Sequence, residues 1–369
     1  MAVYLTMTVL VLAFSVFVAN ASYAEPLLRG KRSVGTDRQQ AINQVSAFGC
    51  FVLMAAVSAC RIAVGNDYWV YRENFKRIYM GREVASEPGF NFVVYWMQKI
   101  FGYDNYLPIF GLFSVVTAAF MVKALKDQAV WFFGSMFLLL CSGYYFQSLN
   151  SVRYYFAIAV VLYAAKYVTG GEYLKFAAWI LFAALFHKSV LIVLPGYLAA
   201  YFLSGKRIRA WMAVPAGILV ASLLFGQSIY RKIIFWFYPY YEASDFDQSR
   251  ISVVNVGMGI CCFVLAVLCA RTITEERREL KFYLWLNGIG LLVNLCGSFI
   301  PEVTRIGNYF RIAQVFLIPS LLYYLPKGKK KVILTVGTLL AFALYFAFFL
   351  RGADDTSIRI LPYRNWIFD

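Results

Sequence analysis

The chain has 369 residues, of which 61% are hydrophobic, 19% are aromatic and only 15% are charged. A soluble domain of average composition carries about 25% charged residues, so this chain has too little polar surface to cover itself in water. Its net charge of +16 comes from short basic clusters between apolar blocks. That distribution argues against a nucleic-acid-binding protein, which would gather its basic residues on one face.

The apolar blocks predict an all-α fold, a polytopic transmembrane helical bundle. A block of about 17–25 residues is long enough for a helix to cross roughly 30 Å of hydrocarbon, where backbone groups must pair within their own segment. We expect about 12 spans in a single integral-membrane domain over residues 1–369, with both termini outside. The expected spans are 1–20, 44–64, 105–123, 129–148, 152–168, 174–187, 189–204, 210–229, 252–270, 282–300, 307–325 and 332–350. The short spans 174–187 and 189–204 could instead form one broken hairpin.

The first block is interpreted as a retained helix. Residues 21–24 resemble a signal-peptidase site, but no basic residue precedes the block, and Arg29, Lys31 and Arg32 follow it. That order favours a first helix whose C-terminal end is cytoplasmic.

Basic residues support the same orientation. The loops assigned to the cytoplasm hold 19 of the 35 basic residues but only 7 of the 19 acidic ones, with a clear basic run at 327–331. This bias follows the positive-inside rule. The external segments are then 65–103 and 230–251. Within the first of them, residues 88–101 are apolar but too short to span, and we expect an external re-entrant or interfacial segment.

Several chemistries are excluded by the sequence. The seven cysteines lie in or beside apolar blocks, without metal-ligand spacing or the look of a disulfide framework. The chain has no P-loop or dinucleotide fingerprint, and one histidine cannot form a multi-histidine metal centre. We therefore expect no metal and no cofactor.

Polar residues converge at the predicted outer ends of the spans. Asp67 follows the second span, with Arg61 one or two turns earlier, and Glu87 precedes the segment 88–101. His187 and Lys188 lie at another outer helix end. Each has a simpler interpretation, because a lone histidine is often a packing residue, an arginine can snorkel and Asp67 can cap a helix.

Two triplets share the spacing i, i+3, i+6, which on a helix keeps three side chains within about 120° of arc. They are Gln147, Asn150 and Arg153, and Arg305, Asn308 and Arg311. Arg153 and Arg311 lie inside apolar blocks. Burying such a charge costs roughly 2.5–3.5 kcal/mol on insertion scales, so each is expected to face a polar cavity or an anion. Outward arginines among aromatic residues suggest an anionic, polyhydroxylated substrate.

With these residues the chain resembles the EpsG family of Wzy-like polysaccharide polymerases. The similarity is carried by Gly65-Asn66-Asp67-Tyr68 with Tyr71, Glu87-Pro88-Gly89-Phe90, Ser148-Leu149-Asn150-Ser151-Val152-Arg153, and Leu185-Phe186-His187-Lys188-Ser189. Family members usually have glutamine after the arginine of the third stretch, where this chain has Tyr154. The C-terminal half is similar in hydropathy, in residues 305–311 and in Pro362-Tyr363.

The resemblance implies a membrane glycosyltransferase on the outer face of a bacterial cytoplasmic membrane. Its substrate would be a polyprenyl-pyrophosphate-linked oligosaccharide, which it would polymerise into exopolysaccharide, capsule or O-antigen. The lipid bilayer, a flippase and a chain-length regulator are the implied partners, with no nucleic acid.

The chemistry suggests a role for each candidate residue. Arginines would hold the leaving pyrophosphate, with Arg153 beside Arg311 or Arg305. A general base would accept the proton of the acceptor hydroxyl, and Asp67, Glu87 and His187 are the candidates, His187 slightly ahead because imidazole titrates near neutral pH. The expected substrate-binding residues are Arg153, Asn150, Arg311, Arg305, Lys188 and Arg61.

Two other classes share this topology. An O-antigen ligase-like or acyl-transferring membrane enzyme would also present arginines outward, and its product would distinguish it. A lipid-oligosaccharide flippase or transporter would be expected to show charges near the bilayer midplane and broken helices in two repeated halves.

Overall fold

The computed structural model describes residues 1–19, 37–205, 213–237, 239, 242, 251–270, 277–354 and 358–368. The named elements in these ranges are helices, which confirms the all-α prediction. The chain divides into two compact units, Met1–Leu191 with Leu325–Asp369, and Ile192–Tyr324.

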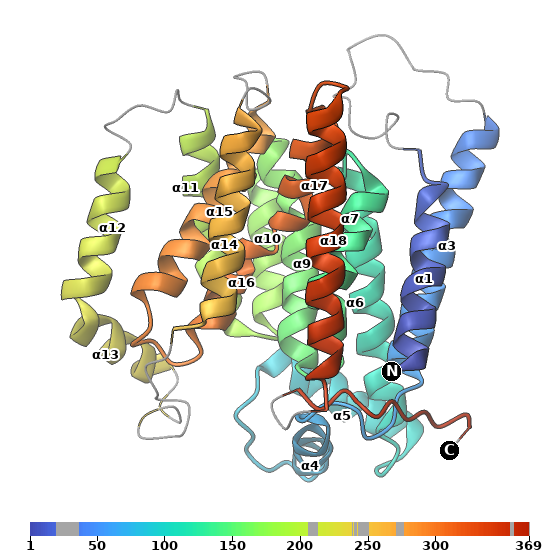
Figure 1. The fold of residues 1–369 in the computed structure, drawn as a ribbon. Helices are drawn as coiled ribbons and strands as arrows, with labels where there is room; N and C mark the ends of the chain where they lie inside the picture. Colours follow the sequence, from blue (N-terminus) through green and yellow to red (C-terminus); the bar gives the residue numbers. More distant parts are fainter. Residues whose placement is uncertain are drawn as a thin grey trace. The chain divides into compact units, whose positions relative to one another are not determined.

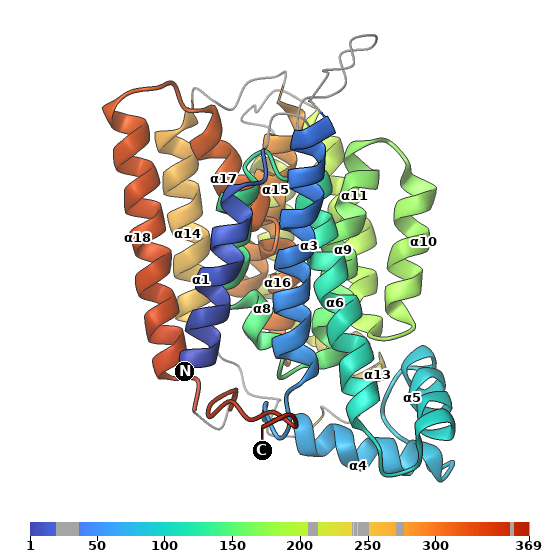
Figure 2. The same cartoon turned by 90° about the vertical axis from the view of Figure 1, so that its right-hand side faces the viewer.

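The first unit is a helical bundle with two helices at one end. In Figures 1 and 2, α1, α3, α6, α9 and α18 run along a common direction, and α4 and α5 lie at the end where both chain termini are found. The bounds are α1 (Ala2–Val16), α3 (Asp37–Ala59), α4 (Tyr68–Tyr79), α5 (Pro88–Phe101), α6 (Leu107–Gln128), α7 (Phe132–Cys141), α8 (Tyr144–Gln147), α9 (Val152–Thr169), α10 (Tyr173–Ala184) and α18 (Lys329–Arg351). A 3-10 helix, η1 (Lys188–Ile192), follows α10.

Helix α9 forms the centre of the first unit. Its residues 154–162 are all buried, as expected for a helix that is apolar on every face. Phe156 on α9 packs edge-to-face against Phe113 of α6 and against Phe186 after α10. The central position of α9 fixes the N-terminal turn of that helix, which carries Arg153.

The second unit contains α11 (Val193–Ser204), α12 (Ala213–Phe225), α13 (Gln227–Phe237), α14 (Val253–Leu268), α15 (Arg278–Cys296), α16 (Val303–Arg311) and α17 (Gln314–Tyr324). Buried amides connect its helices. Asn287 of α15 donates to the Gly259 carbonyl of α14, and Gln314 of α17 donates to the Asn287 Oδ1 at 2.5 Å. Such bonds satisfy polar groups that would otherwise be costly to bury.

The helices identify a multi-pass membrane protein. Among the described residues, Arg38–Ala59, Leu107–Gln128 and Lys329–Arg351 are long and apolar enough to cross a membrane. Shorter apolar helices are Ala2–Val16, Phe132–Cys141, Tyr173–Ala184, Lys188–Ser204 and Val253–Leu268. The total of about 12 spans stays a prediction.

Several predicted spans are not continuous helices, among them 210–229, which is divided between α12 and α13 at Gly226. Span 129–148 is divided into α7 and α8 at Gly143, whose φ of 83° is left-handed, and span 307–325 is divided between α16 and α17. Residues 141–146 and 309–322 are buried. Non-helical backbone is tolerated at membrane depth where protein surrounds it, which explains the breaks in spans 129–148 and 307–325.

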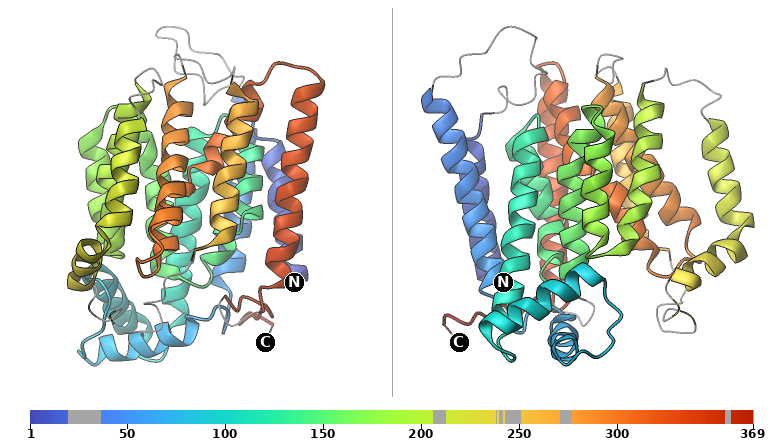
Figure 3. Two further views of the ribbon diagram at one scale, coloured as in Figure 1. Left: turned by 60° about the vertical axis from the view of Figure 1, so that its left-hand side comes forward. Right: turned by 180° about the vertical axis from the view of Figure 1, so that it is seen from behind.

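The predicted segment 88–101 forms helix α5, outside the bundle of the first unit and beside α4 (Figure 3, right). The C-terminal ends of α6 and α9 and the N-terminal end of α18 lie at the other end of this unit (Figure 1). The predicted external segment 65–103 and the predicted cytoplasmic loops after α6 and α9 and before α18 therefore lie at opposite ends of this unit, as the basic residues predict. Of the predicted external segment 230–251, residues 238, 240, 241 and 243–250 lie outside the described residues.

Candidate functional site

The first and third sequence motifs contact each other in the first unit. Gly65 has a φ of 99°, and a Cβ there would lie 2.6 Å from the Leu149 carbonyl oxygen, so only glycine fits. The Asp67 backbone N–H donates to Asn150 Oδ1 at 2.9 Å, and the Ser151 hydroxyl donates to Asp67 Oδ2 at 2.9 Å. The loop before α9 thereby fixes the Asp67 carboxylate.

Asp67 is the N-cap residue of α4, but its side chain makes no capping hydrogen bond. Its Oδ1 has no hydrogen-bond donor in the part of the chain that the structure describes. The side chain is half-buried. The simple helix-capping role is therefore not observed, and one carboxylate oxygen is left to contact a ligand.

The second and fourth motifs form a similar pair. The Gly89 N–H donates to the Leu185 carbonyl at 2.9 Å, and a Cβ on Gly89 would lie 2.8 Å from that oxygen. The Lys188 backbone N–H donates to Glu87 Oε1 at 3.1 Å. Pro88 occupies the first turn of α5, where its missing N–H costs no hydrogen bond. Glu87 is thus held against the turn that contains His187.

Arg153 connects the two pairs of motifs. Its Nη1 lies 2.5 Å from Glu87 Oε2, and the two side chains are 20% and 10% exposed. The guanidinium also lies 5.1 Å from the centre of the Phe90 ring, a cation–π distance. A cation in the first turn of a helix opposes the helix dipole, and Glu87 offsets this.

His187 lies beside the same carboxylate. Its Nδ1 is 3.8 Å from Glu87 Oε1, too long for a hydrogen bond, and its side chain is 12% exposed. The imidazole ring packs edge-on against Tyr154, with ring centres 5.4 Å apart. Tyr154, at the position where the resemblance implies glutamine, is thus an aromatic neighbour of His187.

Comparison with protein families matches residues 46–365 of the chain to the EpsG family. The chain belongs to the EpsG family. No curated protein and no solved structure shows a match. Membership confirms the resemblance drawn from the four motifs, and it indicates a membrane protein of polysaccharide biosynthesis.

The C-terminal tail is a part of this EpsG-family site that the sequence analysis missed. The N–H groups of Gly65 and Asn66 donate to the carbonyls of Arg359 and Ile358 at 2.9 and 3.1 Å. The Tyr363 hydroxyl donates to the Val57 carbonyl at 3.0 Å. The resemblance noted at Pro362-Tyr363 was the available signal. The tail anchors the strand-like segment that precedes Asp67.

Arg61 contacts none of Asp67, Glu87, Arg153 and His187 among the interactions of the described residues. It is 1% exposed, and its Nη1 donates to the Ser58 carbonyl and to the Ser114 hydroxyl, the latter at 2.7 Å. Phe110 lies against the guanidinium at 5.3 Å. The expected substrate-binding role of Arg61 is not supported, because its side chain points into the packing between α3 and α6.

The predicted helical face of Gln147, Asn150 and Arg153 is also wrong. Gln147 ends α8 and accepts a hydrogen bond from Tyr155, and α9 begins only at Val152. Asn150 still contacts Asp67, and Arg153 still contacts Glu87, because the loop of residues 148–151 turns toward Asp67.

The second triplet does share one helix, α16, in the second unit. Arg311 is 2% exposed, donates to Asn308 Oδ1 at 3.1 Å and pairs with no carboxylate among the described residues. Arg305 Nε lies 2.9 Å from Glu302 Oε2. The expected role of Arg305 or Arg311 at the pyrophosphate stays a prediction.

A pocket of about 700 Å³ between the end of α4 and the start of α5 was not predicted. Arg77, Arg82, Glu83 and Asn91 line it, with Arg77 donating to the Glu83 carbonyl. The wealth of charge in segment 65–103 was the sequence signal for this pocket. Its two arginines make it suited to an anionic ligand.

Proposed function

We propose that this EpsG-family protein joins lipid-linked oligosaccharide units into a polysaccharide. The acceptor sugar hydroxyl attacks the anomeric carbon of the donor, the bond from that carbon to the pyrophosphate oxygen breaks, and polyprenyl pyrophosphate leaves. The hydroxyl proton passes to a base on the protein. The observation that supports this most is the Arg153–Glu87 pair, which joins four family motifs at the end of the first unit that carries α4 and α5.

In this proposal Arg153 binds the leaving pyrophosphate. A guanidinium presents a planar fork that matches two phosphate oxygens, and its interaction strengthens as charge develops on the leaving group. Arg153 is one-fifth exposed, so a ligand can reach it. Glu87 holds the guanidinium in place before substrate binds.

Asp67 is the base favoured by the geometry. Both oxygens of Glu87 already accept hydrogen bonds, from Arg153 and from the Lys188 backbone. Asp67 has one oxygen engaged by Ser151 and the other available. His187, held close to Glu87, is the alternative base.

The function is tested with purified protein in liposomes containing one polyprenyl-pyrophosphate-linked repeat unit. A polymerase yields a ladder of products of increasing length, each still on the lipid carrier, and releases one polyprenyl pyrophosphate per bond formed. A ligase would instead require an added acceptor that is not lipid-pyrophosphate-linked. Transport of the unit without any longer product would contradict the proposal.

The site must face away from the cytoplasm for this chemistry. In a variant without the seven native cysteines, a cysteine introduced at Glu83 should react with a membrane-impermeant maleimide in intact cells. A cysteine at Lys329 should react only after permeabilisation, because it lies in the basic run at the opposite end of the first unit. The reverse pattern would remove the basis of the proposed function.

A further inference from the structure

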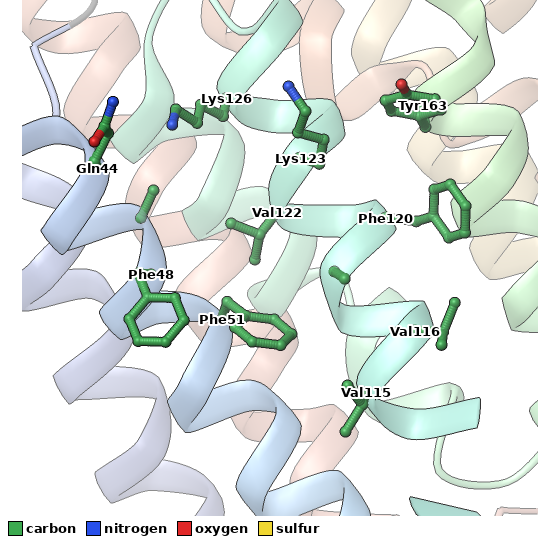
Figure 4. Close-up of a pocket in the computed structure, with 12 residues that line it drawn as sticks. Gln44, Phe48, Phe51, Val115, Val116, Phe120, Val122, Lys123, Lys126 and Tyr163 are labelled. Carbon is green, nitrogen blue, oxygen red and sulfur yellow. The ribbon is translucent and has the colours of Figure 1, made fainter. Parts of the chain in front are cut away.

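An apolar groove of about 680 Å³ lies between α3 and α6 of the first unit, and Tyr163 of α9 also lines it. Figure 4 shows Phe48, Phe51, Val115 and Phe120 along its length. Phe48 is 63% exposed, so the groove opens on the outside of this unit. In a membrane protein such a surface faces lipid.

The groove has a basic end. Lys123 and Lys126 lie at the same end as Tyr163 and Gln44, beyond the apolar side chains (Figure 4). Lys126 pairs with no acidic side chain in the described part of the chain. One end is therefore positively charged and the remainder is apolar.

Asp127 neutralises only part of this charge. Its two oxygens are held by Lys123 at 2.6 Å and by Lys166 at 2.7 Å. Lys166 also lies over the Tyr163 ring, 3.8 Å from its centre. Lys123 and Lys166 thus share one carboxylate and Lys126 adds a third positive charge, so the local excess is positive.

We propose that this groove binds one anionic phospholipid, with the phosphate at Lys123 and Lys126 and an acyl chain along the apolar part. From Val115 to Lys126 helix α6 rises roughly 16 Å, close to one leaflet of a hydrocarbon core that is about 30 Å thick. Lipid phosphates are attracted to lysines at the cytoplasmic surface. The length of the groove matches an acyl chain of such a lipid, and the positive charge at its end matches the lipid phosphate.

The position of the Lys123 and Lys126 amines argues against the lipid-linked substrate as the occupant of the groove. Lys166 is thirteen residues after Arg153 on α9, which places the two roughly 20 Å apart along that helix. A pyrophosphate held by Lys123 and Lys126 would lie far from Arg153. The groove is thus a site independent of the proposed polymerase function.

The test uses the full-length protein in detergent, stripped of lipid and titrated with phosphatidylglycerol or phosphatidylcholine of the same chains. Bound lipid is counted by native mass spectrometry. We expect phosphatidylglycerol to bind more tightly, and the double variant Lys123→Gln, Lys126→Gln to weaken it about thirtyfold. Ala119→Phe, which fills the groove but keeps the lysines, should also lose the lipid.

The matched control is Lys329→Gln, Lys330→Gln, which removes the same charge from exposed positions on α18 outside the groove. It should leave binding unchanged. The proposal is overturned if this control loses as much affinity as the groove variant, or if phosphatidylcholine binds equally well. It is also overturned if polyprenyl phosphate outcompetes phosphatidylglycerol with the same lysine dependence, since the groove would then hold the substrate lipid.

Discussion

Replacing Arg153 by lysine is expected to abolish most polymer formation while the protein remains folded and inserted. Lysine keeps the positive charge beside Glu87, so the largely buried carboxylate is not left without a compensating charge. Lysine cannot reproduce the bidentate fork for two phosphate oxygens. Removing one hydrogen-bond donor to a developing anion typically slows an enzyme about a hundredfold or more, and we expect the rate of polymer formation to fall by a similar factor.

Cells carrying Arg153→Lys should accumulate single repeat units in place of long chains, at protein levels equal to wild type. Arg351→Lys is the matched control, because Arg351 is an exposed arginine at the end of α18 in the same unit. It should give polymer of normal length. Full-length polymer from Arg153→Lys would show that Arg153 serves only as the partner of Glu87, which an ammonium group can also pair with.

The sequence predicted the membrane fold and the four motifs because both are local signals. Apolar blocks of about 20 residues reveal helices, and the motif of residues 87–90 marks the start of α5 at Pro88. Extrapolating a helical spacing across residues 148–151 failed, since α8 ends at Gln147 and α9 begins only at Val152, with turns between them. The burial of Arg61 was not predicted, because its position one or two turns before Asp67 does not reveal that Ser58 and Ser114 contact its side chain.

The pairing of motifs could not be derived from one sequence. Glu87 contacts Lys188, 101 residues away, and Asp67 contacts Asn150, 83 residues away. Such contacts depend on how helices pack, which hydropathy does not encode. The tail is the clearest case, since its carbonyls complete the backbone hydrogen bonds of residues 62–66 from more than 290 positions later.

Replacing Asp67 by asparagine is the second change with a large expected effect. An amide oxygen can still accept the Ser151 hydroxyl, and the backbone N–H bond to Asn150 is unaffected, so the fold should persist. Asparagine cannot accept the proton of the acceptor hydroxyl. Loss of a general base typically lowers the rate about 10²–10⁴-fold, and we expect polymer formation in liposomes to fall within that range.

Asp104→Asn is the matched control, because Asp104 is an exposed carboxylate in the same segment, 3.8 Å from Lys76. It should polymerise at the wild-type rate. His187→Gln separates the two base candidates, since it keeps a hydrogen-bonding side chain beside Glu87 but removes the imidazole. If Asp67→Asn stays active and His187→Gln loses polymerisation, the histidine is the base, and the carboxylate of Asp67 only connects α4 to the loop before α9.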